Sequence, residues 1–142
     1  MKNVVVKFGL LAVIMTVAAI VPAKAQSLQY KLTANIPFDF TVMDKKLPAG
    51  KYSIRRAQIS NGDQVIEIAS ADSRDSVTRM TIPVLTRDPV KEGVLVFHQY
   101  GDEYFLYEIW PAGGTTGRAF PKSRSERELE RKGDAQVARV IL

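Results

Sequence analysis

The stretch that decides the fold is VFHQYGDEYFLYEIW, residues 96–110. It contains the only histidine, the only tryptophan and three of the five tyrosines of the chain. Aromatic and β-branched residues dominate on both sides of Gly101–Glu103, which is typical of two strands joined by a turn. The sequence therefore predicts a hairpin with arms at residues 94–100 and 104–110.

Both faces of this hairpin are substantially apolar. Strict alternation on the second arm predicts one face made of Phe105, Tyr107 and Ile109. The opposite face would then contain Tyr104, Leu106, Glu108 and Trp110. We expect one face to fill the core, and the other to be covered by a loop or helix or to bind a partner.

Period-two alternation continues through most of the chain, at residues 28–34, 34–42, 51–59, 64–70 and 76–84. Pro37 interrupts one of these runs and favours an edge or a bulge there. Turn signals separate the runs at residues 44–52, Asn61–Asp63, 86–93 and 111–117. The pattern predicts a single all-β domain, mainly antiparallel, with about eight short strands in a small barrel or a sandwich.

One short helix is expected near the C-terminus, at about residues 122–132, followed by a closing strand at about 135–141. Ser123 and Glu126 have the spacing of a capping box. The helix is expected to be solvated and pinned by Phe120 and Leu129. The alternative is a basic surface for an anionic group, formed by Arg118, Lys122, Arg124 and Arg127.

The N-terminus has the pattern of a secretory signal peptide. Lys2 and Lys7 precede an apolar run at residues 8–21, and AKA at residues 23–25 offers the small residues that a signal peptidase reads. The run is shorter than the roughly 20 residues of a spanning helix. We expect cleavage after Ala25 and a soluble domain, residues 26–142, with no transmembrane segment, in the periplasm or outside the cell.

Composition excludes several function classes. The chain has no cysteine, which removes lipoprotein attachment, disulfides and thiol catalysis. Three of the 20 basic residues and none of the 15 acidic ones lie in residues 1–25, so the mature chain has 17 basic residues and a net charge of +2. This balance gives no reason to expect nucleic acid as a partner. No phosphate-binding, dinucleotide, calcium or zinc motif is present, so we expect no cofactor and no metal.

The best candidates for a binding site are His98, Tyr100, Tyr104, Trp110 and Arg118. Tyrosine and tryptophan can stack on a sugar or a lipid, and Arg118 can meet an anionic group. The leading hypothesis is a non-enzymatic domain that binds a small molecule, glycan, lipid or envelope protein. One alternative is a hydrolase that uses Glu108 or Asp39 with His98. Another is a subunit of an exported assembly, joined through strand edges or the charged helix.

Several segments resemble a family of small exported proteins common in acidobacteria and similar soil bacteria. The resemblance covers residues 34–132 and is most specific in VFHxYGDxYFL (96–106) and PKSxxEREL (121–129); IPFDFTV (36–42) and LPAGKYSI (47–54) also take part. The family is uncharacterised and has no assigned activity or catalytic residue. The resemblance therefore implies export and a single β domain, and it implies no function.

The signal peptide can be tested by determining the intact mass of the protein after expression in an exporting bacterium. We expect a chain that begins at Gln26, because the peptidase reads the small residues Ala23 and Ala25. Ala25→Phe should block cleavage and leave the protein with the membranes. A wild-type chain that retains residues 1–25 would contradict the prediction.

Overall fold

The computed structural model describes residues 31–57 and 64–142. The predicted signal peptide, the start of the first alternating run and the Asn61–Asp63 turn lie outside the described residues. In the part that is described, no helix has both the length and the apolar character needed to cross a bilayer.

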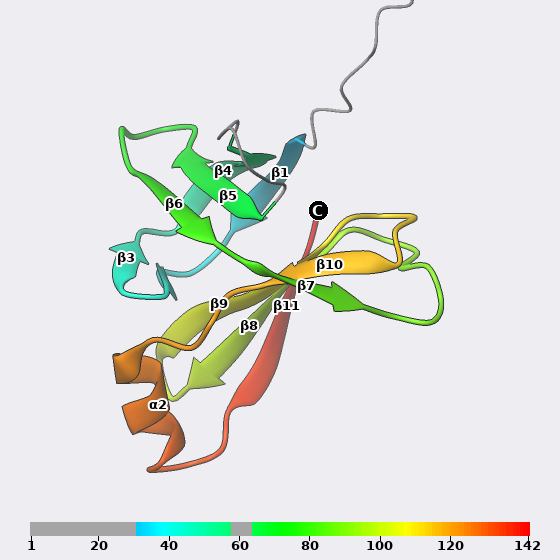
Figure 1. Ribbon diagram of the computed structural model, residues 1–142. Coiled ribbons are helices and arrows are strands. Elements are labelled where there is room, and N and C mark those ends of the chain that lie inside the picture. The colour runs from blue at the N-terminus through cyan, green and yellow to red at the C-terminus, as the bar shows by residue number, and fades with distance from the viewer. Residues whose placement is uncertain (1–30, 58–63) are drawn as a thin grey trace, which may run out of the picture.

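Strands form two sheets that face each other (Figure 1). The first sheet is antiparallel, in the order β1-β4-β5-β6. Its strands are β1 (Lys31–Ile36), β4 (Gly50–Arg56), β5 (Val65–Ser70) and β6 (Ser76–Met80).

The second sheet has the order β11-β8-β9-β10-β7, and the short hairpin β2–β3 joins it through a parallel pairing of β2 with β9. Its strands are β2 (Phe40–Val42), β3 (Lys45–Leu47), β7 (Ile82–Leu85), β8 (Val94–Tyr100), β9 (Glu103–Trp110), β10 (Thr116–Ala119) and β11 (Gln136–Ile141). Neither sheet closes on itself, so the all-β, mainly antiparallel prediction is confirmed in the form of a sandwich. Residues 31–57 and 64–142 contain eleven strands, more than the predicted eight.

The core lies between the two sheets and follows the alternation of the strands. Ile54 on β4, Ile68 on β5, and Leu95 and Phe97 on β8 are almost fully buried. Apolar residues at every second position of a strand share one face, so this face of each sheet turns inward. Each buried side chain of this size contributes roughly 1.5–3 kcal/mol.

The predicted single strand at residues 34–42 is broken at Pro37–Asp39, where the chain crosses from the first sheet to the second. The Asp39 carboxylate accepts a hydrogen bond from the Ala49 N–H (2.9 Å), which joins this crossing to the return crossing between β3 and β4.

The predicted turn at residues 44–52 contains strand β3, because a tight turn at Met43 and Asp44, with Met43 at φ 58°, already reverses the chain.

The segment β6–β7 forms an edge of both sheets, and Figure 1 shows the two strands running on from one sheet to the other. The link between them is Thr81, which is 2 % exposed. Its N–H and its hydroxyl both donate to the Gln64 carbonyl, each at 2.7 Å. These bonds satisfy the buried polar groups at the crossing point.

The predicted faces of the second arm of the hairpin are wrong, because β9 contains a β-bulge. Val96 pairs with Glu108 and Phe97 pairs with Leu106, so Tyr107 is the extra residue. Beyond the bulge the alternation is reversed. Ile109 therefore lies on the core face with Leu106, while Glu108 and Trp110 lie on the outer face with Phe105 and Tyr107.

Helix α2 (Arg124–Glu130) is shorter than predicted and begins at the predicted N-cap, Ser123. It ends at Glu130 because Arg131 is the C-cap, and the N–H of Gly133 returns to the Leu129 carbonyl (3.2 Å). The closing strand is confirmed as β11, which pairs with β8. The predicted loop at residues 111–117 ends earlier than expected, since β10 begins at Thr116.

The packing of the Trp110 ring against β10 can be tested at Gly117. A Cβ atom there would lie 2.6 Å from Cδ2 of Trp110 and 2.9 Å from the Ile109 carbonyl oxygen. Gly117→Ala should lower the free energy of unfolding by about 1–3 kcal/mol, measured by urea denaturation. The control is Gly133→Ala, where a Cβ meets nothing within 4 Å, and it should change stability by at most about 0.5 kcal/mol. Equal effects of the two substitutions would refute this account of the Trp110 contact.

Candidate functional site

The outer face of the β11-β8-β9-β10-β7 sheet contains most of the residues that the sequence singled out. One end of this face, around His98, lies against α2 (Figure 1). The middle, around Val96 and Trp110, is partly exposed, and at β7 the face borders an open hollow.

His98 is held between a ring and a carboxylate. Its imidazole stacks on Tyr107, with ring centroids 4.0 Å apart and planes at 24°. Its Nδ1 lies 2.8 Å from Oε1 of Glu126 on α2. The His98 and Glu126 side chains are only 12 % and 5 % exposed, so a short, largely desolvated hydrogen bond attaches the helix to the sheet.

The capping box predicted from Ser123 and Glu126 is only half formed. The Ser123 hydroxyl accepts the Glu126 N–H (3.2 Å), as predicted. The Glu126 carboxylate bonds to His98, which is 28 positions away in the sequence. Glu126 is therefore the buried residue of α2. The sequence predicts instead that Phe120 and Leu129 hold the helix in place. Phe120 is buried in the core, and Leu129 is half-buried.

Tyr100 also lies at the end of the outer face that α2 covers, which we call the covered end. Its ring meets Phe105 edge-on at 6.0 Å, and Phe105 is 2 % exposed. Burial is the main cause that raises the pKa of Tyr100, and the charge of Glu126 raises it further while Lys122 lowers it. The Tyr100 hydroxyl oxygen is buried and has no hydrogen-bond partner among the described residues. The covered end is therefore a small second core beneath α2.

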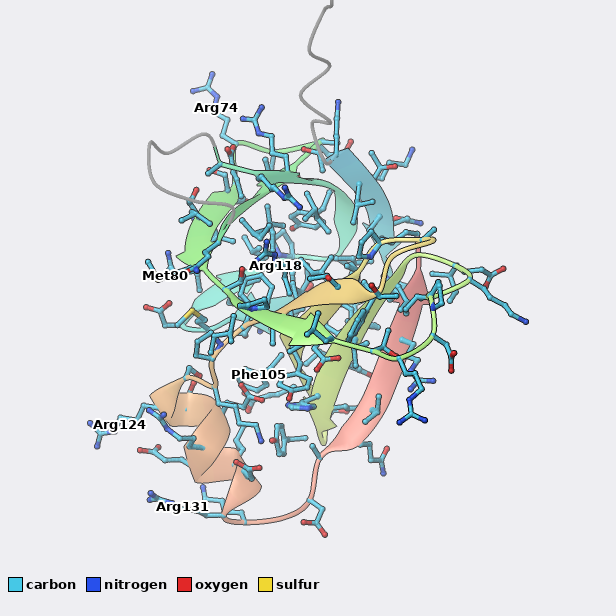
Figure 2. All side chains as sticks on the ribbon, turned by 45° about the vertical axis from the view of Figure 1, so that its right-hand side comes forward. Arg74, Met80, Phe105, Arg118, Arg124 and Arg131 are labelled. Carbon is cyan, nitrogen blue, oxygen red and sulfur yellow. The ribbon has the colours of Figure 1, made fainter. Side chains whose placement is uncertain are left out.

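The five predicted binding residues do not form one surface. His98, Tyr100 and Trp110 lie on the outer face. Tyr104 lies on the core face, stacked on Phe38 with centroids 3.9 Å apart. Arg118 pairs with Ile109, so it also lies on the side of the sheet that faces the core. Figure 2 shows Arg118 between the sheets, well away from Phe105.

The residues proposed for hydrolysis each have a separate partner. Glu108 accepts a hydrogen bond from Nε1 of Trp110 (2.8 Å). Asp39 accepts the Ala49 N–H in the link between β1 and β2. In residues 31–57 and 64–142, no group of three or more histidine, aspartate or glutamate residues could hold a metal ion.

The charged helix faces solvent. Arg124 pairs with Glu128 (3.1 Å) and Lys122 pairs with Glu130. The hydrogen bond between the latter two raises the pKa of Lys122 and lowers that of Glu130. Figure 2 shows Arg124 pointing away from the sheet. These ion pairs compensate two of the four basic residues of the predicted anion-binding surface, Lys122 and Arg124.

An open hollow of about 600 Å³ lies where β6 passes into β7. Its lining is mainly apolar and comes from four segments that are distant in sequence: the β2–β3 turn, the residue before β5, the β6–β7 segment and the lead-in to α2. The lining residues are Met43, Gln64, Arg79, Met80, Thr81, Ile82, Pro83 and Pro121. Met80 and Ile82 are 66 % and 55 % exposed, although both are large and apolar.

Arg79 is the charged group of the hollow. Its guanidinium donates to the carboxylate of Asp44 at 2.8 Å, and this hydrogen bond lowers the pKa of Asp44. Sequence reasoning missed the hollow. The alternating run at residues 76–84 contained a signal for it. This run places Met80 and Ile82 on the same side as the polar Thr78, so two large apolar residues share a side that faces solvent.

Several features of the free edge of β6–β7 hinder strand addition. The Asp75 carbonyl and the Thr81 N–H form hydrogen bonds with the two ends of the β5 segment. Because backbone groups alternate in direction along an antiparallel strand, the groups of Ser76, Thr78 and Met80 point away from β5. The outward carbonyl of Ser76 accepts from Lys45 (2.8 Å), and the carbonyl of Thr78 accepts from Arg79 (3.0 Å). On β7, Pro83 has no N–H to donate. Such features prevent edge-to-edge association.

The chain matches no protein-family model, no curated protein and no solved structure. The resemblance to exported acidobacterial proteins therefore stays a prediction, and the geometry of the described residues is the basis for any proposal about function.

The bond between His98 and Glu126 can be tested by a double-mutant cycle. Glu126→Ala should lower the free energy of unfolding by about 1–3 kcal/mol, because it leaves a buried imidazole without its partner. The matched control is Glu128→Ala, which removes an exposed pair with Arg124 and should cost at most about 0.5 kcal/mol. His98→Ala combined with Glu126→Ala should show a coupling above about 0.5 kcal/mol. Additive effects would mean that this bond does not hold the helix.

Proposed function

We propose that this protein is an exported, non-enzymatic binding domain of the cell envelope, and that the hollow beside β6–β7 holds an apolar chain such as the acyl chain of a lipid. The observation that carries the proposal is the apolar lining of the hollow. Met80 and Ile82 are held in solvent there, although burial of such side chains is worth roughly 1.5–3 kcal/mol each.

The chemistry of the lining favours a flexible aliphatic ligand over a flat or polar one. Met43 and Met80 are unbranched and adapt to irregular shapes, while Pro83 and Pro121 add apolar surface of fixed shape. A volume of about 600 Å³ is in the range of small-molecule sites. Arg79 supplies a positive charge at this site, so a carboxylate or phosphate head group can compete with Asp44 for its guanidinium.

The hydrolase alternative has less support from the arrangement of the described residues. His98 and Glu126 form a histidine–carboxylate pair, but both side chains are largely buried under α2. No hydroxyl group of the described residues bonds to the imidazole as a nucleophile would. Glu108 and Asp39 are each bonded elsewhere.

Binding can be tested with dodecanoate and dodecanol, measured by isothermal calorimetry and by thermal shift. We expect dodecanoate to bind and to raise the melting temperature, since a ligand that binds the folded state stabilises it. Met80→Glu should weaken binding at least about ten-fold, because it places a charge against the aliphatic chain.

The matched control is Leu85→Glu, which changes an apolar residue of the same segment that is 78 % exposed and does not line the hollow. It should leave dodecanoate affinity unchanged. Dodecanol should bind more weakly than dodecanoate if Arg79 meets the head group. Equal losses in the two glutamate variants, or no binding of either ligand, would refute the assignment of the hollow.

A further inference from the structure

The second sheet has two edges, and β11 forms the edge opposite β7. In the part of the chain that the structure describes, β8 is the only strand that pairs with β11 (Figure 1). Strand β1 of the first sheet lies near β11, but it pairs with β4. One side of the β11 backbone is therefore left without a neighbouring strand.

The register of β11 shows which of its backbone groups point outward. The N–H of Leu142 donates to the Gly93 carbonyl (2.8 Å), so every second residue back from Leu142 bonds to β8. The backbone groups of the residues between them, Val137, Arg139 and Ile141, point away from β8. Among the described residues, no backbone group from elsewhere in the chain bonds to these three. They present a row of free donors and acceptors.

The β11 edge lacks the features that hinder strand addition at β6–β7. It contains no proline, and its pairing with β8 runs without a bulge from Gln136 to Ile141. Val137 and Ile141 are 59 % and 57 % exposed. Helix α2 covers the neighbouring His98, but it leaves the side chains of β11 accessible. A regular, exposed edge of this kind is a template for another strand.

The charge of Arg139 determines which strands fit this edge. Arg139 is exposed on the outer face between Val137 and Ile141, and it forms no ion pair with any described residue. A second copy of β11 is a poor match for it. Antiparallel pairing centred on Arg139 places the two arginines directly opposite, and pairing centred on Ala138 places them about 7–8 Å apart on the diagonal. Arg139 therefore disfavours self-association and favours a strand with an acidic residue.

We infer that β11 accepts a strand from another protein, in which an acidic residue is flanked at alternate positions by two apolar residues. In antiparallel pairing, the N–H and C=O groups of this segment bond to the outward groups of β11. Its acidic residue lies opposite Arg139, and its apolar residues lie opposite Val137 and Ile141. Because the β6–β7 edge is hindered, the sheet grows on one side only.

The test uses the capped peptide Thr-Val-Thr-Glu-Thr-Val-Thr, with its dissociation constant measured by isothermal calorimetry at up to ~1 mM peptide. We expect binding in the micromolar range. N-methylation of the glutamate amide should weaken binding at least about ten-fold, because this N–H points toward β11 in the pairing. The matched control is N-methylation of the threonine that follows the glutamate. Its N–H points away from β11, so the dissociation constant should stay unchanged.

The selection of an acidic partner is tested by charge reversal. A peptide with lysine in place of the glutamate should bind the wild-type protein about ten-fold more weakly. Arg139→Glu should reverse this preference, and melting curves should show that this variant, at an exposed position, remains folded. The control is Arg127→Glu, which reverses an exposed charge on α2 and should leave both dissociation constants unchanged.

Three results would overturn the inference: no binding of the glutamate peptide, equal effects of the two N-methylations, or a charge preference that Arg139→Glu does not reverse. A dimer of the protein that sedimentation equilibrium detects and the peptide dissociates would overturn the choice of partner in favour of a second copy. Strand β11 contains no residue that lines the hollow, so these outcomes are independent of dodecanoate binding.

Discussion

One extra residue in β9 organises the second sheet. The bulge at Tyr107 reverses the alternation of the strand, so that Leu106 and Ile109 both reach the core although they are three positions apart. It also gathers Phe105, Tyr107 and Trp110 on the outer face. Without it, Ile109 would turn to solvent and Trp110 would enter the core. The covered end around His98 and the partly exposed middle of the outer face, around Val96 and Trp110, both follow from this register shift.

The outer face needs a cover at one end, and α2 supplies it. A helix of seven residues has too few hydrogen bonds to be stable alone. It is held by its lead-in, where the Phe120 N–H donates to the Tyr107 carbonyl (2.8 Å), and by the Glu126–His98 bond. A buried polar pair contributes less free energy than an apolar contact of the same size, but it specifies one position for the helix on the sheet. The same pair explains the location of the only histidine.

The continuous edge β6–β7 combines partly protected backbone groups with exposed side chains. Two of its outward carbonyls, those of Ser76 and Thr78, already accept hydrogen bonds from Lys45 and Arg79, which hinders strand addition. Its exposed side chains, by contrast, line the hollow on one side of the second sheet. Exposed apolar surface therefore remains at side chains, in the hollow and in the middle of the outer face around Val96 and Trp110, while the sheet edge between them is partly protected. This distribution is compatible with the proposed aliphatic ligand, and it does not favour open-ended strand pairing.

The sequence by itself determined the fold class, because period-two alternation and turn residues are local signals that every strand carries. It also predicted the hairpin turn near Gly101, the N-cap at Ser123 and the closing strand. The faces of β9 could not be predicted, since nothing local distinguishes a bulge at Tyr107 from strict alternation. Tertiary structure alone separated Tyr104 and Arg118 from His98, and brought Glu126 to an imidazole 28 positions away. It also assembled the hollow from Met43, Met80 and Pro121. These outcomes depend on which strands become neighbours, and that is decided by packing of the whole core.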